Sequence, residues 1–323
     1  MLVALVDLID AIPSPSEPGR QGSQGGRPPI YSDRLFLKAL VIMVVRNVST
    51  VSGLIAMLEQ PTWEMAALRG RLTEAGRFPS RRTWERRLAL VPGSLPGRIG
   101  CFGRHLVERI APWAAGGHAV AIDSTVMHAR GGVWHKKHRD AGVVPHTSID
   151  TEAGWTKSGW HGWVYGWKLH LVTTVAAVWI PLAAELTPAT TADNDPAPRL
   201  LDELPPEARF VLGDTHYNDP AVRDHCFGAG RLLVATRRGA YPHTDDGVEV
   251  RRVFHKLRSL AIENFNGQFK GIFDAHGSVP TRGLVRTQRF ALGAVFVYQL
   301  TLLYRFEHAQ DLRVGLKAFL KAA

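Results

Sequence analysis

Two short apolar runs that each end in an aspartate constrain the fold most strongly. The run His118-Ala-Val-Ala-Ile-Asp123 follows two glycines, and Phe210-Val-Leu-Gly-Asp214 has the same form. Short apolar runs that are rich in β-branched residues and bounded by turn signals are typical of buried strands. Each aspartate therefore comes at the end of a predicted strand.

Strand and helix patterns alternate through the same part of the chain. Three further strands are predicted at residues 166–174, 178–186 and 231–236, and two helices at residues 192–204 and 220–227. The first three strands follow one another closely, which predicts an antiparallel meander, whereas helices separate the later ones. This α/β order matches a ribonuclease H-like mixed sheet flanked by helices better than a Rossmann fold, whose glycine-rich fingerprint is absent. In such a sheet the first and fourth strands are neighbours, so we expect Asp123 and Asp214 to meet.

A third carboxylate, Glu263, lies within residues 256–273, where apolar residues at helical spacing predict a helix. Before it, Asp245-Asp246-Gly247 predicts the turn of a small hairpin spanning residues 241–253. Three converging carboxylates suit two Mg²⁺ ions, because hard cations prefer oxygen ligands. A single Asp is more commonly a helix cap, and we interpret Asp193, Asp195 and Asp219 in that way.

The N-terminal third has a different pattern. Residues 13–29 are dense in Pro, Gly, Ser and Gln, so we expect residues 1–30 to be a flexible leader and folding to start near Tyr31. Ser32, Thr50 and Ser80 are predicted helix caps. Residues 31–112 are therefore predicted to form a small all-α domain, and residues 113–323 the α/β domain.

The charge of the chain favours nucleic acid as its partner. Lys and Arg number 39 against 29 Asp and Glu, a formal net charge of +10. One predicted helix carries Arg81, Arg82 and Arg86, with Arg82 and Arg86 one turn apart, a spacing that suits contacts with the phosphates of DNA. A basic helix can equally be a solvated surface. No apolar run is long enough to span a membrane, no signal peptide is evident, and the two cysteines suggest no disulfide framework, so we expect a cytoplasmic protein.

Residues 134–168 mix tryptophans with basic residues. Such aromatics could stack on DNA ends, and they could equally cover the sheet. Lys168 is our predicted phosphate contact in this segment.

Four motifs resemble those of the DDE transposases of bacterial insertion sequences. They are Ala121-Ile-Asp-Ser-Thr125, Gly166-Trp-Lys-Leu-His170, Leu212-Gly-Asp-Thr-His-Tyr-Asn-Asp219 and Ile262-Glu-Asn-Phe-Asn-Gly-Gln-Phe-Lys270. The resemblance implies that Asp123, Asp214 and Glu263 are catalytic and bind two Mg²⁺ ions, with Mn²⁺ as a substitute, and that Lys270 faces DNA. The family often has an Arg and a Tyr where this chain has Ser259 and Lys256, and we assign the DNA contact to the nearby Arg258.

The predicted activity is therefore binding of transposon terminal inverted repeats, followed by metal-dependent strand cleavage and transfer into target DNA. Two ends must be joined, so we expect a homodimer on double-stranded DNA, in a bacterial cytoplasm and associated with the nucleoid. Two alternatives remain: a ribonuclease H-like nuclease without strand transfer, and a non-catalytic DNA-binding domesticated transposase.

Overall fold

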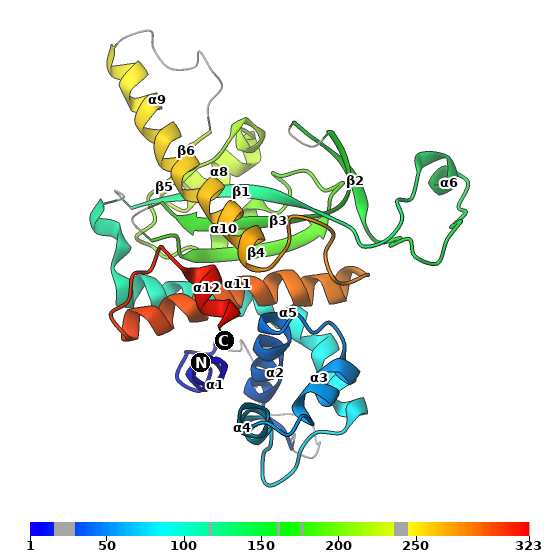
Figure 1. The fold of residues 1–323 in the computed structure, drawn as a ribbon. Coiled ribbons are helices and arrows are strands. Elements are labelled where there is room, and N and C mark those ends of the chain that lie inside the picture. The colour runs from blue at the N-terminus through cyan, green and yellow to red at the C-terminus, as the bar shows by residue number, and fades with distance from the viewer. Residues whose placement is uncertain (16–29, 116–117, 160–161, 176–177, 236–244, 323) are drawn as a thin grey trace, which may run out of the picture.

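The computed structural model of the protein is built on a six-stranded mixed sheet (Figure 1). It describes residues 1–15, 30–115, 118–159, 162–175, 178–235 and 245–322. The strands are β1 (Ala119–His128), β2 (Gly154–Ser158), β3 (Gly162–Thr174), β4 (Pro181–Pro188), β5 (Phe210–Leu212) and β6 (Leu232–Val234). They are ordered β2-β3-β1-β5-β6, and β4 also pairs with β3.

The pairing of the strands confirms the ribonuclease H-like prediction. Strand β3 runs antiparallel to β1 and to β4, which forms the predicted meander. Strand β5 lies parallel to β1, with Ala121 opposite Leu212, and β6 continues the parallel part. The first and fourth predicted strands are thus neighbours. Strand β2, which pairs with the start of β3, was not predicted.

Helices cover both faces of the sheet. The long helices α5 (Arg81–Ile110) and α11 (Leu284–Glu307) pack together against β4, below the sheet in Figure 1. Gly103 allows this approach, because a Cβ there would lie 2.5 Å from the Pro181 carbonyl oxygen. The buried Gln299 amide donates to the Ile99 and Pro181 carbonyl oxygens, at 2.9 and 2.8 Å, which ties α11 to both neighbours.

The opposite face carries one continuous helical rod, drawn in yellow and orange in Figure 1. It consists of α9 (Asp245–Arg258), a π-helical segment η3 (Ser259–Glu263) and α10 (Asn264–Ile272). Ala261 and Ile262 of η3 pack into a small apolar cluster with Ala121 and Leu212. Smaller elements complete the fold: α6 (Lys136–Asp140), α7 (Ala197–Asp202), α8 (Pro220–Gly228), α12 (Leu316–Lys321), and the short 3₁₀ turns η1 (Pro112–Ala115) and η2 (Thr215–Tyr217).

The predicted N-terminal caps are confirmed. The side chains of Ser32, Thr50 and Ser80 accept hydrogen bonds from backbone amides in the first turns of α2, α3 and α5. Helices α2 (Asp33–Val45), α3 (Val51–Leu58) and α4 (Trp63–Arg71) form a cluster beneath α11 in Figure 1. Helix α2 contacts both α5 and α11, so this helical region shares its core with the α/β region.

The prediction of a flexible leader was wrong for its first residues. Residues Leu2–Leu8 form helix α1, in which Leu2, Leu5 and Val6 are buried. These positions are spaced three and four residues apart and so form one helical face. Asp7 forms an ion pair with Arg71 of α4 at 3.0 Å, which holds α1 in place. Ile9 and Ile12 of the predicted leader are buried as well, and its residues 16–29 lie outside the described residues.

Two other predictions needed correction. Residues 245–258 form α9 and not a hairpin strand, since acidic residues are also favoured in the first turn of a helix, where Asp245 and Asp246 stand; residues 241–244 lie outside the described residues. The helix predicted at residues 192–204 is limited to Ala197–Asp202. Among the described helices, none combines the length and the apolar character that crossing a bilayer requires.

Candidate active site

The pairing of β1 with β5 brings Asp123 and Asp214 together. Each aspartate stands two residues beyond the paired residues Ala121 and Leu212. Residues two apart on a strand lie on the same face of the sheet, so Asp123 lies on the face of Ala119 and Ala121, which η3 covers. Asp214 begins the turn η2, and its carboxylate accepts hydrogen bonds at 2.8 and 2.9 Å from the His216 backbone amide and Nδ1.

Asp123 lies in strongly acidic surroundings. The pKa of its carboxyl group is raised to about 7, first by burial and then by the negative charges of Asp214 and Asp193. Two influences lower this pKa: the hydrogen bond from the Ser124 amide, at 2.8 Å, and the charge of Arg258. The ionised carboxylate is therefore disfavoured both by its burial and by its acidic neighbours. This is the environment that a bound cation would stabilise.

Asp193 belongs to the same centre, although the sequence led us to interpret it as a helix cap. Helix α7 begins with Pro196 as its cap residue and has no side-chain cap. The Asp193 carboxylate instead accepts a hydrogen bond from Ser124 Oγ at 2.7 Å and pairs with Lys168 Nζ at 3.0 Å. The prediction for Asp219 is confirmed, because its side chain caps α8.

The predicted phosphate contact required Lys168 to lie on the open surface, but it does not. Its side chain is nearly buried, and besides its pairing with Asp193 it donates to the Thr191 carbonyl oxygen at 2.9 Å. Beside it on β3, His170 is fully buried, and burial lowers the pKa of its imidazole to about 4. His170 is therefore neutral near pH 7, which makes Lys168 the cation that balances Asp193.

Two neighbours of Asp214 complete this side of the site. The hydrogen bond that the His216 imidazole donates to Asp214 raises the pKa of this imidazole, which is largely exposed. Tyr217 is buried beneath, where burial and then the charges of Asp123, Asp193 and Asp214 raise the pKa of its phenol. Its hydroxyl has no hydrogen-bond partner among the described residues. Gly213 makes room for the Tyr217 side chain, since a Cβ there would lie 2.9 Å from the Tyr217 Cβ and 3.2 Å from its ring.

Glu263 is close to this face but does not complete a cluster of ligands. It follows Ile262, which packs against Ala121 and Leu212, and its side chain is exposed at the end of η3. No group of three or more His, Cys, Asp or Glu among the described residues is positioned to hold a metal ion. The structure thus joins two of the three predicted carboxylates and holds the third on an adjacent helix. The oxygen-rich donor set and the raised pKa of Asp123 fit a divalent cation.

The predicted basic contacts lie in three different settings. Arg258, at the end of α9, is close enough to Asp123 to lower its pKa. Lys270 on α10 is half-buried, and burial lowers the pKa of its ammonium group. At the start of α5 the predicted arginines are exposed; Arg81 pairs with Glu85 at 2.8 Å, whereas Arg82 and Arg86 have no described ion-pair partner.

The tryptophans divide between the two interpretations left open by the sequence. Trp167 is fully buried in the core, and Trp155 packs against Tyr165 with ring centroids 5.3 Å apart. These two cover the sheet. The side chain of Trp163 is 68% exposed at the start of β3 and is free to contact a partner.

A family model described as transposase DDE domain matches residues 115–300, more than half of the chain. The chain belongs to this family. It is therefore a transposase, an enzyme that cuts DNA and transfers strands, and enzymes of this family use divalent metal ions. The match contains the sheet, Asp123, Asp214, Glu263 and most of α11.

Solved structures of transposases resemble the chain distantly. The piggyBac transposase in a synaptic complex with hairpin DNA has a TM-score of 0.41 and 9% identity, covering 99% of this chain and 76% of that chain. The Mos1 transposase in a paired-end complex with the left transposon end has a TM-score of 0.24 and 16% identity, covering 89% and 80%. The Mos1 mariner paired-end complex with Mn has the same values. No curated protein matches the chain.

Proposed function

We propose that this transposase cleaves DNA at transposon ends and joins the ends to target DNA, with Asp123, Asp214 and Glu263 as its catalytic carboxylates. The observation that carries the assignment is the register of β1 and β5, which sets two carboxylates side by side on adjacent parallel strands. The raised pKa of Asp123, caused first by burial and then by the charge of Asp214, supports a role in binding cations.

Asp123 and Asp214 would hold two Mg²⁺ ions, for which Mn²⁺ could substitute, and Glu263 would join them when DNA occupies the site. Bound Mg²⁺ would stabilise charge on the attacking and leaving oxygens of a phosphodiester. The Lys168–Asp193 pair fixes the Ser124 segment of β1 and so positions Asp123. Arg258 lies where its positive charge reaches Asp123, and it would also attract the scissile phosphate.

The reaction would proceed by two transfers at one centre. Water attacks the phosphodiester at the transposon end and frees a 3′-hydroxyl, and this hydroxyl then attacks a phosphodiester of target DNA. Neither step needs a covalent bond to the protein. The largely exposed His216, hydrogen-bonded to Asp214, is available to take up a proton near neutral pH.

The helices of residues 31–112 would recognise the terminal inverted repeats, and residues 113–323 would hold the cleaved strand. Exposed Arg82 and Arg86 on α5, together with the paired Arg81, would contact phosphates, as would Lys270 on α10. Lys168 would act on DNA only through its pairing with Asp193. Because two ends are joined in one event, the active complex would be a homodimer on double-stranded DNA.

A cleavage assay with matched carboxamide variants tests this assignment. The substrate is a duplex carrying the inverted repeats that flank the coding DNA, incubated with Mg²⁺. Asp214→Asn should lose cleavage, because it removes one negative charge from the centre. Asp219→Asn is the control, since Asn caps a helix as well as Asp does and α8 should persist. Equal cleavage by wild type and Asp214→Asn would refute the assignment.

Strand transfer distinguishes the transposase from a nuclease of the same fold. Precut duplex ends with free 3′-hydroxyls are offered together with a supercoiled plasmid. The proposal predicts plasmid molecules joined to the ends. Cleavage of intact ends without any joined product would instead indicate a nuclease, and binding without either reaction would indicate a non-catalytic DNA-binding protein.

A further inference from the structure

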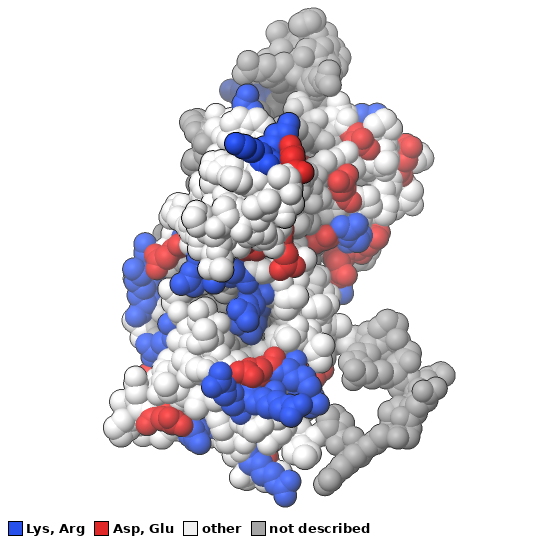
Figure 2. Space-filling model, turned by 90° about the vertical axis from the view of Figure 1, so that its right-hand side faces the viewer, with Lys and Arg blue, Asp and Glu red and all other residues white. Residues whose placement is uncertain are grey.

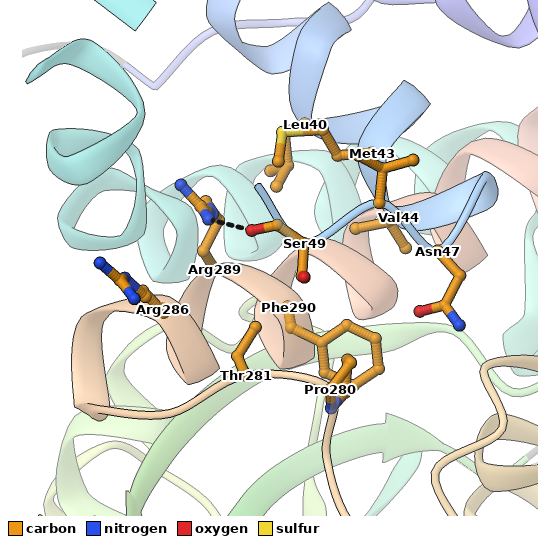
Figure 3. A pocket seen from close by; sticks show the side chains of 11 residues that line it. Leu40, Met43, Val44, Asn47, Ser49, Pro280, Thr281, Arg286, Arg289 and Phe290 are labelled. Atoms are coloured by element: carbon orange, nitrogen blue, oxygen red, sulfur yellow. Dashed lines mark hydrogen bonds between the residues drawn. The ribbon is translucent and has the colours of Figure 1, made fainter. Parts of the chain in front are cut away.

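An arginine-lined groove lies where the N-terminal helices meet the α/β region. Its walls come from the loop between α2 and α3 at Ser49, from the end of β1 at Arg130, and from the segment leading into α11. Figure 3 shows Arg286 and Arg289 extending side by side from α11, with Arg289 donating to the Ser49 carbonyl oxygen at 3.0 Å. Arg130, Arg282 and Arg286 line this groove, and Arg289 lines a smaller pocket that shares Ser49 and Arg286 with it; we call the groove and these four arginines the arginine groove.

The backbone around the groove is held in place. His128 at the end of β1 forms a bridge with Ser278, and the Val279 amide donates to the His128 carbonyl oxygen at 2.9 Å. Gly131 has a φ of +92° and lies against the Ser148 carbonyl oxygen, which a Cβ at this position would approach to 2.2 Å. The segments that carry the arginines are therefore positioned before any ligand arrives.

None of the four arginines of the groove forms an ion pair with an acidic residue in the described part of the chain. Arg130 and Arg282 donate to the Pro280 and Thr147 carbonyl oxygens, at 2.5 and 2.7 Å. These neutral acceptors orient the guanidinium groups and leave their charge intact. Burial and the charge of Arg286 both lower the pKa of Arg289.

Two acidic residues stand near the start of α11, and both are already engaged. Asp150 accepts a hydrogen bond from the Gly283 amide at 2.9 Å, and Glu152 accepts one from the Leu284 amide at 3.1 Å. They satisfy the first amides of α11 and do not line the groove. An anion that enters the groove would therefore meet guanidinium donors without competition from a lining carboxylate.

We propose that the arginine groove binds a backbone phosphate of the DNA that this transposase cleaves. Guanidinium groups recognise phosphate through charge-assisted, often bidentate hydrogen bonds. The groove has a volume of about 340 Å³ and opens to the surface, so a phosphate can enter while it remains part of a duplex. The proposal rests on the proposed function, because it takes DNA as the substrate.

The position of the groove along β1 indicates which phosphate it would bind. Arg130 lies seven residues beyond Asp123, which corresponds to at most about 23 Å at about 3.3 Å per residue of strand. A duplex rises about 3.4 Å per base pair, so in a duplex that runs along β1 the bound phosphate would lie up to about seven base pairs from the cut.

On the face shown in Figure 2, Lys and Arg gather in the middle and lower half, whereas Asp and Glu gather at the upper right.

The first test measures binding of a fluorescein-labelled 30-base-pair duplex as a function of salt. Arg282 and Arg286 are exposed, so the double variant Arg282→Gln/Arg286→Gln should fold; its circular dichroism melt is compared with that of wild type. We expect the affinity to fall about 10-fold and the slope of log Kd against log salt to fall by about 1, as loss of one phosphate contact predicts. Arg209→Gln is the control: Arg209 is exposed before β5, near the opposite end of β1.

The second test locates the phosphate. Single uncharged methylphosphonates are placed in turn along a cleavable duplex, and binding is measured for wild type and for the double variant. Wild type should be sensitive at a position about seven base pairs from the cut, and the double variant should lose that sensitivity alone. Identical sensitive positions in the two proteins, or an unchanged salt slope in the double variant, would overturn the proposal.

The controls separate this proposal from the proposed function. If wild type neither binds nor cleaves DNA, the proposed function fails together with the groove. If wild type cleaves DNA and the double variant keeps its affinity and slope, only the groove fails. If millimolar inorganic phosphate stabilises wild type while the double variant keeps full DNA affinity, the groove is a free-phosphate site and the proposal is wrong.

Discussion

Strand β1 carries Asp123 near its middle and ends two residues before Arg130, and the surroundings of these two residues have opposite charge. Around Asp123, burial and then the charges of Asp214 and Asp193 raise the pKa of its carboxyl group. Around Arg130, arginines crowd together, and burial and then the charge of Arg286 lower the pKa of Arg289. Lys168 and Arg258 balance the acidic centre only in part, and the arginines of the groove form no ion pair among the described residues, although one strand connects the two regions.

The difference suggests a division of labour along the strand. Like charges that are held together cost stability, and a ligand of opposite charge recovers that stability when it binds. The acidic centre suits metal cations, and the arginine groove suits phosphate. Changes in the acidic centre should therefore alter chemistry, and changes in the groove should alter DNA affinity. Variants of each region can test this separation.

The largest effect is expected from Asp123→Asn. Cleavage at saturating DNA should fall by at least about 1000-fold, because stabilisation by metal ions contributes several kcal/mol to such reactions. DNA affinity should stay the same or rise slightly, since a negative charge is removed. The Arg282→Gln/Arg286→Gln variant should behave in the opposite way, with weakened affinity and a cleavage rate at saturation close to wild type. Single-turnover kinetics measure the cleavage rate, and binding curves measure the DNA affinity. If both variants lost cleavage rate, or both lost affinity, the separation would be false.

The next effect concerns the cation inside the acidic centre. Lys168→Met should lower the free energy of unfolding by about 3 kcal/mol, because Asp193 would keep its charge in a nearly buried place. Arg81→Ala, which removes an exposed ion pair with Glu85, should lower it by less than about 0.5 kcal/mol. Urea denaturation measures both. Similar losses in the two variants would show that the Lys168–Asp193 pair contributes no more than a surface pair.

The smallest effect is on the stability of the metal-free protein as pH changes. The pKa of Asp123 is about 7 in the folded chain, above its ordinary value of 3.8. The folded state therefore holds this proton more tightly, and its contribution to stability is full below about pH 4 and is lost as pH rises through 7. Asp123→Asn should thus be more stable than wild type at pH 8, and no more stable at pH 3. A constant difference across this range would contradict the raised pKa.

The meeting of Asp123 with Asp214 could be predicted from the sequence. Apolar runs define strands, and a strand ladder fixes which residues lie opposite one another. The caps Ser32, Thr50 and Ser80 could be predicted for a similar reason, because a cap depends only on local backbone geometry. Features that follow from local backbone geometry or from regular strand pairing could therefore be predicted from the sequence.

Other features depend on contacts between distant segments. Asp193 precedes a helix and looks like a cap, but its carboxylate is bound by Ser124 and Lys168, on β1 and β3. A carboxylate that follows a strand of the same sheet is the one signal that could have pointed to it. Helix α1 depends on packing against α4 that no local pattern reveals. The arginine groove joins segments that lie more than 200 residues apart in the chain, as in the contact of Arg289 with Ser49.

The most direct test of the central claim is binding of Mn²⁺ to the metal-free protein at pH 8, measured by electron paramagnetic resonance without DNA. Wild type and Asp219→Asn should bind Mn²⁺ with the same affinity, and Asp214→Asn should bind it at least about 10-fold more weakly, since one oxygen ligand loses its charge. Mn²⁺ affinity that is unchanged in Asp214→Asn, or reduced equally in Asp219→Asn, would contradict the assignment of Asp123 and Asp214 as the metal-binding centre of this transposase.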